Sequence, residues 1–235
     1  MNNLIYTKKE RTFMKIKELS LYTNKLREQK EFYTSVIGLK LLNENIDSFT
    51  LSIGSTKLTF MESNVSYNYH FAINIPSNKI AEGADWLEQK VEIQKFNGDE
   101  IVKFPNWNAN AIYFYDGSKN IVEFIARKNL NINSKSEFSK NNFISVSEIG
   151  VPTVDVQNIY SQLNRNYKLE KYDCEDNIFC AVGDEGGLFI IIDHTKKKWI
   201  PNMDDAKPNP FEITFENQEK QLYKFRFENE TIINK

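Results

Sequence analysis

Cysteine, histidine and long apolar runs are all scarce in this sequence. Its 235 residues include only two cysteines, Cys174 and Cys180, which are too few for the disulfide framework of a small secreted domain. We therefore expect free thiols on neighbouring strands. No apolar stretch approaches the roughly 20 residues of a transmembrane helix. The longest, over residues 188–192, has the length of a strand.

Charge of one sign is not in excess either. The net charge is −2 and the two signs are interspersed, so the sequence has no basic stripe of the kind that binds nucleic acid. Residues 8–11 are charged where a signal peptide would need an apolar core. We expect a soluble, cytoplasmic protein that binds neither nucleic acid nor membrane. Its 17 Phe and 11 Tyr suit sheets and apolar pockets.

A repeated order of strand and helix patterns runs along the chain. In the first unit, the pattern predicts a strand over residues 16–22 and a helix over 26–37 that ends at Gly38. Three short strands follow over 39–43, 48–53 and 57–61, with a tight turn at Gly54-Ser55. Together these elements make one βαβββ unit.

The same order recurs twice more. The second unit has a strand over 69–75, a helix capped by Ser77, and strands over 91–94, 111–115 and 120–127. The third has a strand over 145–153, a helix over 156–164 capped by Asp155, and strands over 169–172, 178–182 and 188–193. Residues 18–21 (ELSL) match 148–151 (EIGV), which supports true repetition. Two closing strands, over 211–215 and 222–227, suggest a truncated fourth unit.

These patterns divide the chain into four parts. Residues 1–13 precede the first patterned segment and are expected to be a disordered extension. Residues 14–128 hold two βαβββ units, which we expect to pair in one cupped sheet around an active site. Residues 129–143, rich in Asn, Ser and Lys, form the natural linker. The third unit and the closing strands occupy 144–235.

Two local motifs resemble those of a known superfamily. Residues 31–39 (EFYTSVIGL) resemble the "FY…LG" signature of the vicinal-oxygen-chelate proteins, and residues 113–124 (YFYDGSKNIVEF) resemble their "D-P-x-G-N-x-x-E" hairpin. Gly117 replaces the usual proline and Lys119 the usual glycine, while Asn120 and Glu123 stay in register. The superfamily includes glyoxalase I, extradiol dioxygenases and bleomycin-resistance proteins. The resemblance implies an α+β fold of repeated βαβββ units that form cupped mixed sheets.

The resemblance also implies a metal site. In this superfamily the ligands come from the first and last strands of the units, which here correspond to Glu18, His70 and Glu123, with Thr59 as a poor fourth candidate. One imidazole and two carboxylates with open positions suit Fe(II), Mn(II) or a similar divalent ion such as Zn(II). Such an ion would chelate two adjacent substrate oxygens and polarise them. Its affinity is expected to fall as pH drops through the titration of His70.

Each of these ligands also has a structural interpretation. His70 begins a strand, where a hydrogen-bonded structural histidine would be unremarkable. An exposed strand glutamate is the rival interpretation of Glu18, and its repetition as Glu148 in the third unit favours a structural cause for both. Glu123 is the hardest to dismiss, because a carboxylate in so apolar a strand is costly if it is buried unpaired.

Other candidate site residues lie in the second unit. Tyr113 and Glu123 are the candidates for catalytic proton transfer. The candidates for substrate binding near the pocket rim are Trp107, Asn108, Asn110 and Tyr115. Turn formation by the asparagines and packing by the aromatic residues are the alternative interpretations.

These observations support three hypotheses on function. The leading one is a metal-dependent enzyme of the glyoxalase or extradiol-dioxygenase kind, acting on a small molecule with vicinal oxygens. The second is a metal-free protein that binds or sequesters a small, partly aromatic ligand, as bleomycin-resistance proteins do; the missing second histidine favours it. The third is a degenerate member kept for interaction alone. Many relatives pair two chains in a homodimer to build a pocket, which three units in one chain could make unnecessary.

Overall fold

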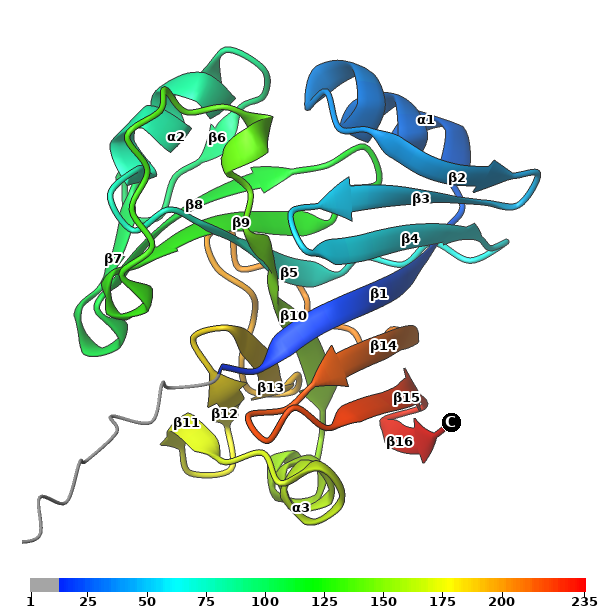
Figure 1. The fold of residues 1–235 in the computed structure, drawn as a ribbon. Helices are drawn as coiled ribbons and strands as arrows, with labels where there is room; N and C mark the ends of the chain where they lie inside the picture. Colours follow the sequence, from blue (N-terminus) through cyan, green and yellow to red (C-terminus); the bar gives the residue numbers. More distant parts are fainter. Residues whose placement is uncertain (1–12) are drawn as a thin grey trace, which may run out of the picture.

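The strands of the chain form two mixed sheets. Figure 1 shows the computed structural model, which describes residues 13–235. The expected extension over residues 1–13 therefore lies, except for Phe13, outside the described residues. Within the described part, the strand–helix–strands order of all three predicted units is present, and no helix is long and apolar enough to cross a membrane.

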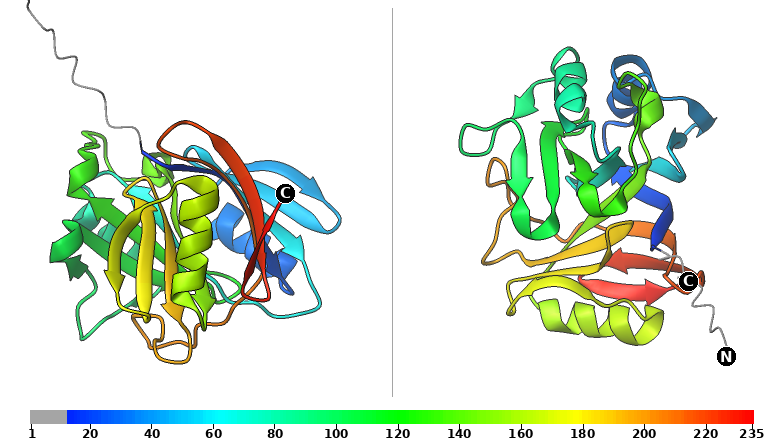
Figure 2. Two further views of the ribbon diagram at one scale, coloured as in Figure 1. Left: turned by 90° about the horizontal axis from the view of Figure 1, so that it is seen from below. Right: turned by 60° about the vertical axis from the view of Figure 1, so that its left-hand side comes forward.

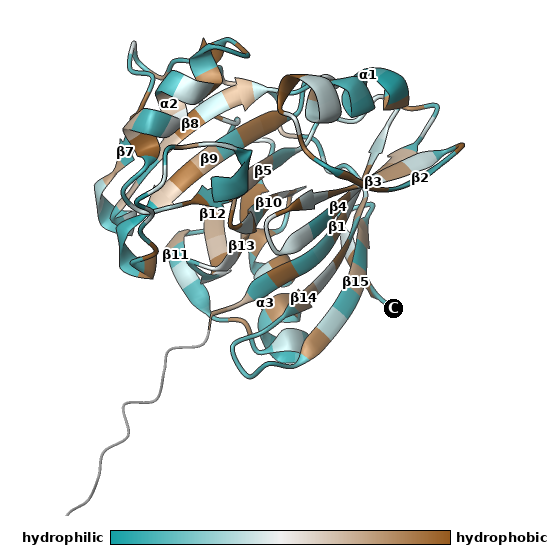
Figure 3. Ribbon diagram, turned by 45° about the horizontal axis from the view of Figure 1, so that its top comes forward, coloured by the Kyte–Doolittle hydropathy of each residue, from teal (hydrophilic) through white to brown (hydrophobic). Residues whose placement is uncertain are grey.

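The first sheet joins the first unit to the closing strands. Its order is β16 (Thr231–Asn234), β15 (Leu222–Glu228), β14 (Phe211–Glu216), β1 (Lys15–Thr23), β4 (Thr56–Glu62), β3 (Ser48–Ile53) and β2 (Leu41–Asn45). At its centre β1 pairs antiparallel with β14 and parallel with β4. Hydrophilic and hydrophobic residues alternate along β1 and β15 (Figure 3), so one face of this sheet packs on the core while the other meets solvent.

The second sheet joins the second unit to the third. Its order is β11 (Lys171–Glu175), β12 (Phe179–Asp184), β13 (Gly187–Asp193), β10 (Ser145–Thr153), β5 (His70–Ile75), β9 (Ile121–Arg127), β8 (Ala109–Tyr115) and β6 (Ile93–Gln94), with β7 (Val102–Phe104) also beside β8. Strands β5 and β10 pair antiparallel at its centre. All residues of β5, β9, β10 and β13 are buried, because both faces of this sheet are covered.

Three helices cover the sheets. Helix α1 (Leu26–Glu31) continues into a π-helical turn (Phe32–Val36) and stops before Gly38, whose φ of 82° favours glycine. Helix α2 (Ile80–Glu88) packs on β6, β8 and β9. Helix α3 (Val156–Tyr167) lies along β12 and β13, as Figure 2 shows.

The two predicted helix caps have different outcomes. Asp155 caps α3 as predicted, since its carboxylate accepts a hydrogen bond from the Asn158 backbone N–H at 3.0 Å. Ser77 does not cap α2, which begins three residues later. The Ser77 hydroxyl instead donates to the Arg127 carbonyl at 2.7 Å and so ties the start of this helix segment to the end of β9.

The segment over residues 129–143 is packed on the second unit. It holds no strand, and short 3₁₀ turns lie at its two ends, Lys128–Leu130 and Lys140–Asn142. Phe138 and Phe143 are buried and contact Trp86 of α2, with ring centroids 5.7 and 5.9 Å away. The predicted linker therefore contributes apolar side chains to the core.

The pairing of units differs from the prediction. The first and second units were expected to share one cupped sheet within residues 14–128, but they lie in different sheets. The second unit pairs with the third instead, through β5 and β10. The burial patterns of the strands explain this pairing. Strand β1 alternates buried and more exposed residues and has one face exposed to solvent, whereas β5 and β10 are buried on both faces.

The prediction of free thiols was wrong. Cys174 of β11 lies directly opposite Cys180 of β12 in an antiparallel ladder, and the two form a disulfide. The expectation of neighbouring strands was correct. Directly opposed strand residues bring their Cβ atoms within reach of a single bond, which counting cysteines does not reveal.

Candidate functional site

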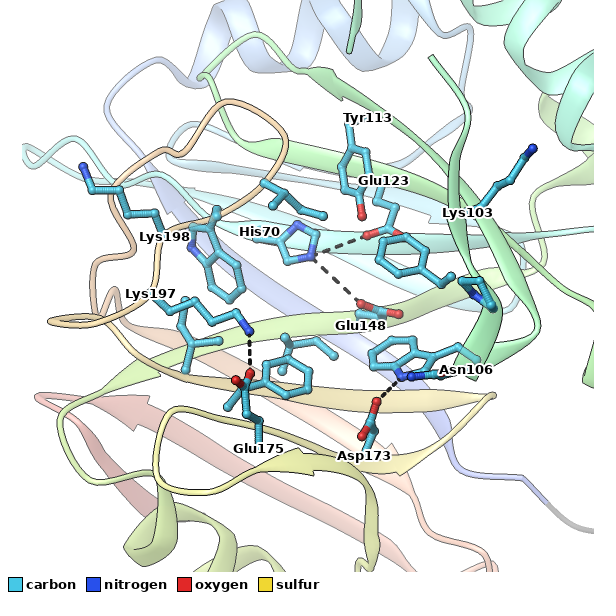
Figure 4. Close-up of a pocket in the computed structure, with 18 residues that line it drawn as sticks. His70, Lys103, Asn106, Tyr113, Glu123, Glu148, Asp173, Glu175, Lys197 and Lys198 are labelled. Atoms are coloured by element: carbon cyan, nitrogen blue, oxygen red, sulfur yellow. Dashed lines mark hydrogen bonds and ion pairs between the residues drawn. The ribbon is translucent and has the colours of Figure 1, made fainter. Parts of the chain in front are cut away.

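One face of the second sheet carries polar residues from neighbouring strands. Glu123 pairs with Ala72 in the parallel ladder of β9 and β5, and Glu148 pairs with Ala72 in the antiparallel ladder of β10 and β5. His70 lies two residues before Ala72 and therefore points to the same face. Tyr113 of β8 pairs with Glu123. Strand register thus brings an imidazole, two carboxylates and a phenol together, as Figure 4 shows.

The three acid–base side chains converge on a small volume. His70 Nε2 lies 3.6 Å from Glu123 Oε2 and 4.0 Å from Glu148 Oε2, and all three side chains are at most 7% exposed. Candidate ligand atoms of the three residues lie within 4.8 Å of one another. Nδ1 of His70 lies 3.3 Å from the Ile121 carbonyl, so a proton on Nδ1 can be donated there. The Nε2 lone pair is then free to bind an ion.

A buried arginine completes the polar cluster. Arg127 of β9 is fully buried, and its Nη2 atom forms an ion pair and hydrogen bond with Glu148 Oε1. The Nε and Nη1 atoms of Arg127 have no hydrogen-bond partner. The indole of Trp107 covers the guanidinium, whose carbon lies 5.5 Å from the ring centroid. Glu148 is therefore held by a cation from one side and faces His70 on the other.

Burial shifts the pKa of each group in this cluster. Desolvation lowers the pKa of His70 to about 4, so the imidazole is neutral near neutral pH. Desolvation and the neighbouring Glu148 carboxylate raise the pKa of Glu123 well above its ordinary value. Desolvation raises the pKa of Glu148 as well, while Arg127 opposes that rise. Burial and the Glu123 carboxylate hold the pKa of Tyr113 well above its ordinary value, so the phenol keeps its proton.

The cluster lies in a pocket of about 490 Å³, which is in the range typical of small-molecule sites. Apolar side chains make most of its wall: Phe104, Trp107, Phe179, Ile190, Ile192 and Trp199. Trp107 stands at the boundary of the two units, because its indole N–H donates to Asp173 of β11 at 2.6 Å. At the rim, Lys197 lies 3.2 Å from Glu175. The pocket is mostly apolar, with polar groups concentrated at the cluster.

Two of the three predicted metal ligands meet, and the third does not. His70 and Glu123 converge as predicted, but Glu18 lies on β1 in the other sheet. The Glu18 side chain is 49% exposed and its carboxylate lies 3.2 Å from Lys57 Nζ. Glu148, its counterpart in the third unit, stands beside His70 instead. The convergence predicted for Glu18 is thus wrong because its unit does not pair with the second unit.

The internal symmetry of the second sheet identifies a fourth position. The antiparallel pairing of β5 with β10 gives the sheet an approximate two-fold symmetry, which places His70 and Glu148 in equivalent positions. The same symmetry makes Ala72 equivalent to Gly150, and Ala72 pairs with Glu123. Gly150 pairs with Ile190 of β13, so Ile190 corresponds to Glu123. Ile190 is buried in the pocket wall. The site therefore has three polar positions and one apolar one, which leaves a side of the cluster without a protein ligand.

The remaining predicted residues divide between the pocket and its surroundings. Tyr113 and Trp107 line the pocket, and Tyr115 lines a neighbouring cavity. Asn108 does not line the pocket; it occupies a left-handed turn with φ 49° and donates to Asn129 at 2.8 Å. Asn110 alternates with the buried Ala109 and Ala111 of β8 and does not line the pocket either. Asn108 therefore serves a turn, which was the alternative interpretation, whereas Asn110 lies within strand β8.

Sequence reasoning missed three residues of this site. Glu148 was noted as a repeat of Glu18, and this match between the first and third units was the signal that could have identified it. Arg127 ends a predicted strand and carries no motif, so nothing in the sequence singled it out. Trp199 belongs to a loop between β13 and β14, and its place over His70 follows only from tertiary packing.

Comparison with known proteins identifies the fold. No protein-family model and no curated protein matches this sequence. Among solved structures, a "putative dioxygenase" from Bacillus subtilis is similar with a TM-score of 0.58 and 15% identity, over 77% of this chain and 64% of that chain. The V278E variant of glyoxalase I from Zea mays is similar with a TM-score of 0.52 and 11% identity, over 90% of this chain and 91% of that chain. This chain thus spans less than two thirds of the Bacillus protein.

These similarities and the βαβββ units define the fold of the protein. The chain has the fold of these dioxygenase and glyoxalase I structures, the vicinal-oxygen-chelate fold that the sequence motifs predicted. The predicted fold class, α+β with repeated βαβββ units in mixed sheets, is confirmed as well. A shared fold at this level of identity leaves the activity to be argued from the site.

Proposed function

We propose that this protein is a divalent-metal-dependent enzyme of the glyoxalase or extradiol-dioxygenase kind, acting on a small molecule with vicinal oxygens. The observation that carries the proposal is the convergence of His70, Glu123 and Glu148 at the polar end of an apolar pocket. Glu148 takes the place of Glu18 in the ligand set proposed from the sequence. The pocket is built from the second and third units of one chain, so the proposed site needs no second copy of the chain.

The charge of the donor set fits a divalent cation. Two buried carboxylates, Glu123 and Glu148, face one buried guanidinium, Arg127, and a neutral His70. When both carboxylates are ionised, one negative charge in this cluster has no compensating cation, which is costly in a buried site. An ion held by His70, Glu123 and Glu148 would supply that positive charge. Imidazole and carboxylate ligands suit Fe(II), Mn(II) and Zn(II).

The chemistry follows from the groups around this set. A bound divalent ion would act as a Lewis acid that polarises two adjacent substrate oxygens. The Glu123 carboxylate lines the pocket beside His70, where it is placed to accept a proton from the substrate and return it. Tyr113 hydrogen-bonds Glu123 and orients its carboxylate. Trp107 and the apolar walls would hold the carbon skeleton of the substrate and exclude water.

Titration calorimetry on chelator-treated protein tests the proposal. The wild type should bind Mn(II) or Zn(II) at micromolar concentration, whereas His70→Ala and Glu148→Gln should lose that binding because each removes a ligand. Glu18→Gln is the matched control, since Glu18 is the exposed counterpart of Glu148 and should leave the affinity unchanged. No binding by the wild type, or equal binding by Glu148→Gln, would contradict the proposal.

A metal-free binding protein is the second candidate, and one observation favours it. Arg127 already pairs with Glu148, so part of the charge that a metal would neutralise is compensated within the protein. In this case the pocket would bind a small, partly aromatic ligand against its Trp and Phe walls. The same titration separates the candidates, because this one predicts no metal binding and ligand affinity that is insensitive to chelators.

A further inference from the structure

Arg127 is a buried cation beside the pocket. Its side chain is fully buried, and it is not among the described residues that line the pocket. It follows Glu123 by four residues on β9, so strand alternation directs both side chains to the same face of the sheet. The indole of Trp107, which does line the pocket, covers the guanidinium. In this arrangement Arg127 acts on a bound ligand through its neighbours and not by direct contact.

The polar contact of this side chain is a single carboxylate oxygen. Arg127 Nη2 donates to Glu148 Oε1, and within residues 13–235 its Nε and Nη1 atoms have no hydrogen-bond partner. A buried ion pair commonly stabilises a fold no more than apolar residues of similar volume would. Stability alone therefore does not account for this guanidinium, and its one hydrogen bond connects it to Glu148.

This contact leaves Glu148 with one oxygen for the site. Oε1 accepts the hydrogen bond from Arg127, whereas Oε2 lies 4.0 Å from His70 Nε2 on the side of the pocket that Figure 4 shows. The positive charge of the guanidinium repels a second cation at Oε1. Carboxylates bind metal ions through one oxygen or through both. The arginine therefore favours binding through Oε2 alone.

His70, at the equivalent position of β5, is limited to one donor atom in a similar way. Its Nδ1 lies 3.3 Å from the Ile121 carbonyl, which leaves Nε2 for the site. The two central strands thus each present a single donor atom, and the protein holds the second polar atom of each side chain. Fewer donor atoms from the protein leave more coordination positions of an ion for a ligand.

We propose that Arg127 is a positioning residue, which holds Oε1 of Glu148 so that a metal ion would receive only Oε2 and keep a further coordination position for a ligand. This inference deepens the proposed function and rests on it. Arg127 also affects the charge of the site. A divalent ion together with Glu123, Glu148 and Arg127 would carry a net positive charge, which favours a ligand with ionised oxygens.

Three substitutions of Arg127 separate its charge from its hydrogen bond. Arg127→Met removes both, and Arg127→Gln removes the charge but keeps an N–H donor. Arg127→Lys keeps the charge and tests whether a different cation restores the behaviour of the wild type. Arg226→Met is the matched control, because Arg226 Nη2 donates to Glu228 at 2.7 Å on β15 of the first sheet and neither residue lines the pocket.

The first readout is the number of water molecules on bound Mn(II). The broadening of its electron paramagnetic resonance lines in water enriched in a magnetic oxygen isotope counts them. Arg127→Met and Arg127→Gln should hold about one water fewer than the wild type, because Oε1 takes a coordination position when no cation holds it. Calorimetry should show these two variants binding Mn(II) about tenfold more tightly, since the carboxylates lack their buried cation. Arg127→Lys and Arg226→Met should resemble the wild type.

The second readout is the affinity of the Mn(II)-loaded protein for catechol, a probe with two adjacent oxygens. Arg127→Met and Arg127→Gln should bind catechol about tenfold more weakly, because the site has lost a coordination position and a positive charge. Tighter metal binding together with weaker ligand binding distinguishes a positioning role from a purely structural one, which would leave the water count of the folded variants unchanged. An unchanged water count in the folded neutral variants would overturn the inference.

These measurements also separate the inference from the proposed function. If the wild type binds no Mn(II), the proposed function fails and the positioning role fails with it. If the wild type binds Mn(II) but the neutral variants keep its water count and its affinity for catechol, the function stands and the positioning role does not. Circular dichroism establishes which variants fold, and Arg127→Gln decides the matter if Arg127→Met does not fold.

Discussion

Replacing Arg127 tests the electrostatics of the site directly. It is fully buried and paired with Glu148, which is itself 2% exposed. Replacing Arg127 by Met keeps much of the volume and removes the charge. Breaking a buried pair from one side is strongly destabilising, by about 3–5 kcal/mol, because the remaining charge is left uncompensated.

The size of the effect can be expressed as a melting temperature. For a chain of this length, each kcal/mol corresponds to about 2–4 °C, so Arg127→Met should melt roughly 6–20 °C below the wild type without metal. The double variant Arg127→Met/Glu148→Gln removes both charges and should recover most of the loss. Arg226→Met is the control, since the Arg226–Glu228 pair is partly exposed and should contribute about 0–1 kcal/mol.

Metal should act differently on the wild type and on Arg127→Met. Without the guanidinium, Glu123 and Glu148 lack their buried cation, and a divalent ion should compensate them more strongly. Saturation at about 100 times the dissociation constant stabilises a protein by ~2.7 kcal/mol. Scanning calorimetry in EDTA and in Mn(II) should therefore show a larger metal-induced shift for Arg127→Met. The reasoning is refuted if this variant melts with the wild type in EDTA, or if Mn(II) shifts both equally.

Three further predictions follow from other features of the site. Ile190→Glu places a carboxylate at the apolar fourth position, so calorimetry should show tighter Mn(II) binding than in the wild type, and unchanged affinity would argue against the symmetry. Glu123 keeps a proton in the folded protein that the unfolded chain releases above its ordinary pKa, so the contribution of Glu123 to metal-free stability should fall as the pH rises above that ordinary pKa, and urea titrations should show Glu123→Gln gaining stability relative to the wild type with rising pH. The disulfide closes a loop of sequence separation 6, so thiol titration should find no free cysteine and a dithiol should lower stability by about 2 kcal/mol; two reactive thiols in the native protein would contradict this.

The pH dependence of metal binding also changes from what the sequence predicted. The sequence placed the proton competition at His70, near the pKa of a free imidazole. Burial lowers the pKa of His70 to about 4, and it raises that of Glu123. Metal affinity should therefore keep rising with pH well above the pKa of His70, because Glu123, whose pKa is raised, must lose its proton to bind. Calorimetry across this range is the check, and an affinity that levels off at pH 6.5 would assign the competing proton to the imidazole.

The sequence by itself determined the local units of this protein. Strand and helix periods depend on neighbouring residues, so the order of the three units and the strands at Ser48–Ile53 and Ser145–Thr153 could be predicted to the residue. His70 and Glu123 were identified from the resemblance to the vicinal-oxygen-chelate motifs, and they meet because the first and last strands of their unit pair directly. The short strands β7 and β16 were missed, since so few residues carry little periodicity.

Only the tertiary structure decided which units face each other. Glu18 and Glu148 occupy equivalent places in similar local sequences, and nothing near either residue distinguishes a ligand from an exposed glutamate. The difference arises because β10 pairs with β5, while β1 pairs with β14 about two hundred residues later. The same long-range packing buries Arg127 beside Glu148 and lays Trp199 over His70. Contacts between distant segments depend on which faces of the sheets are covered, and local sequence patterns do not contain that information.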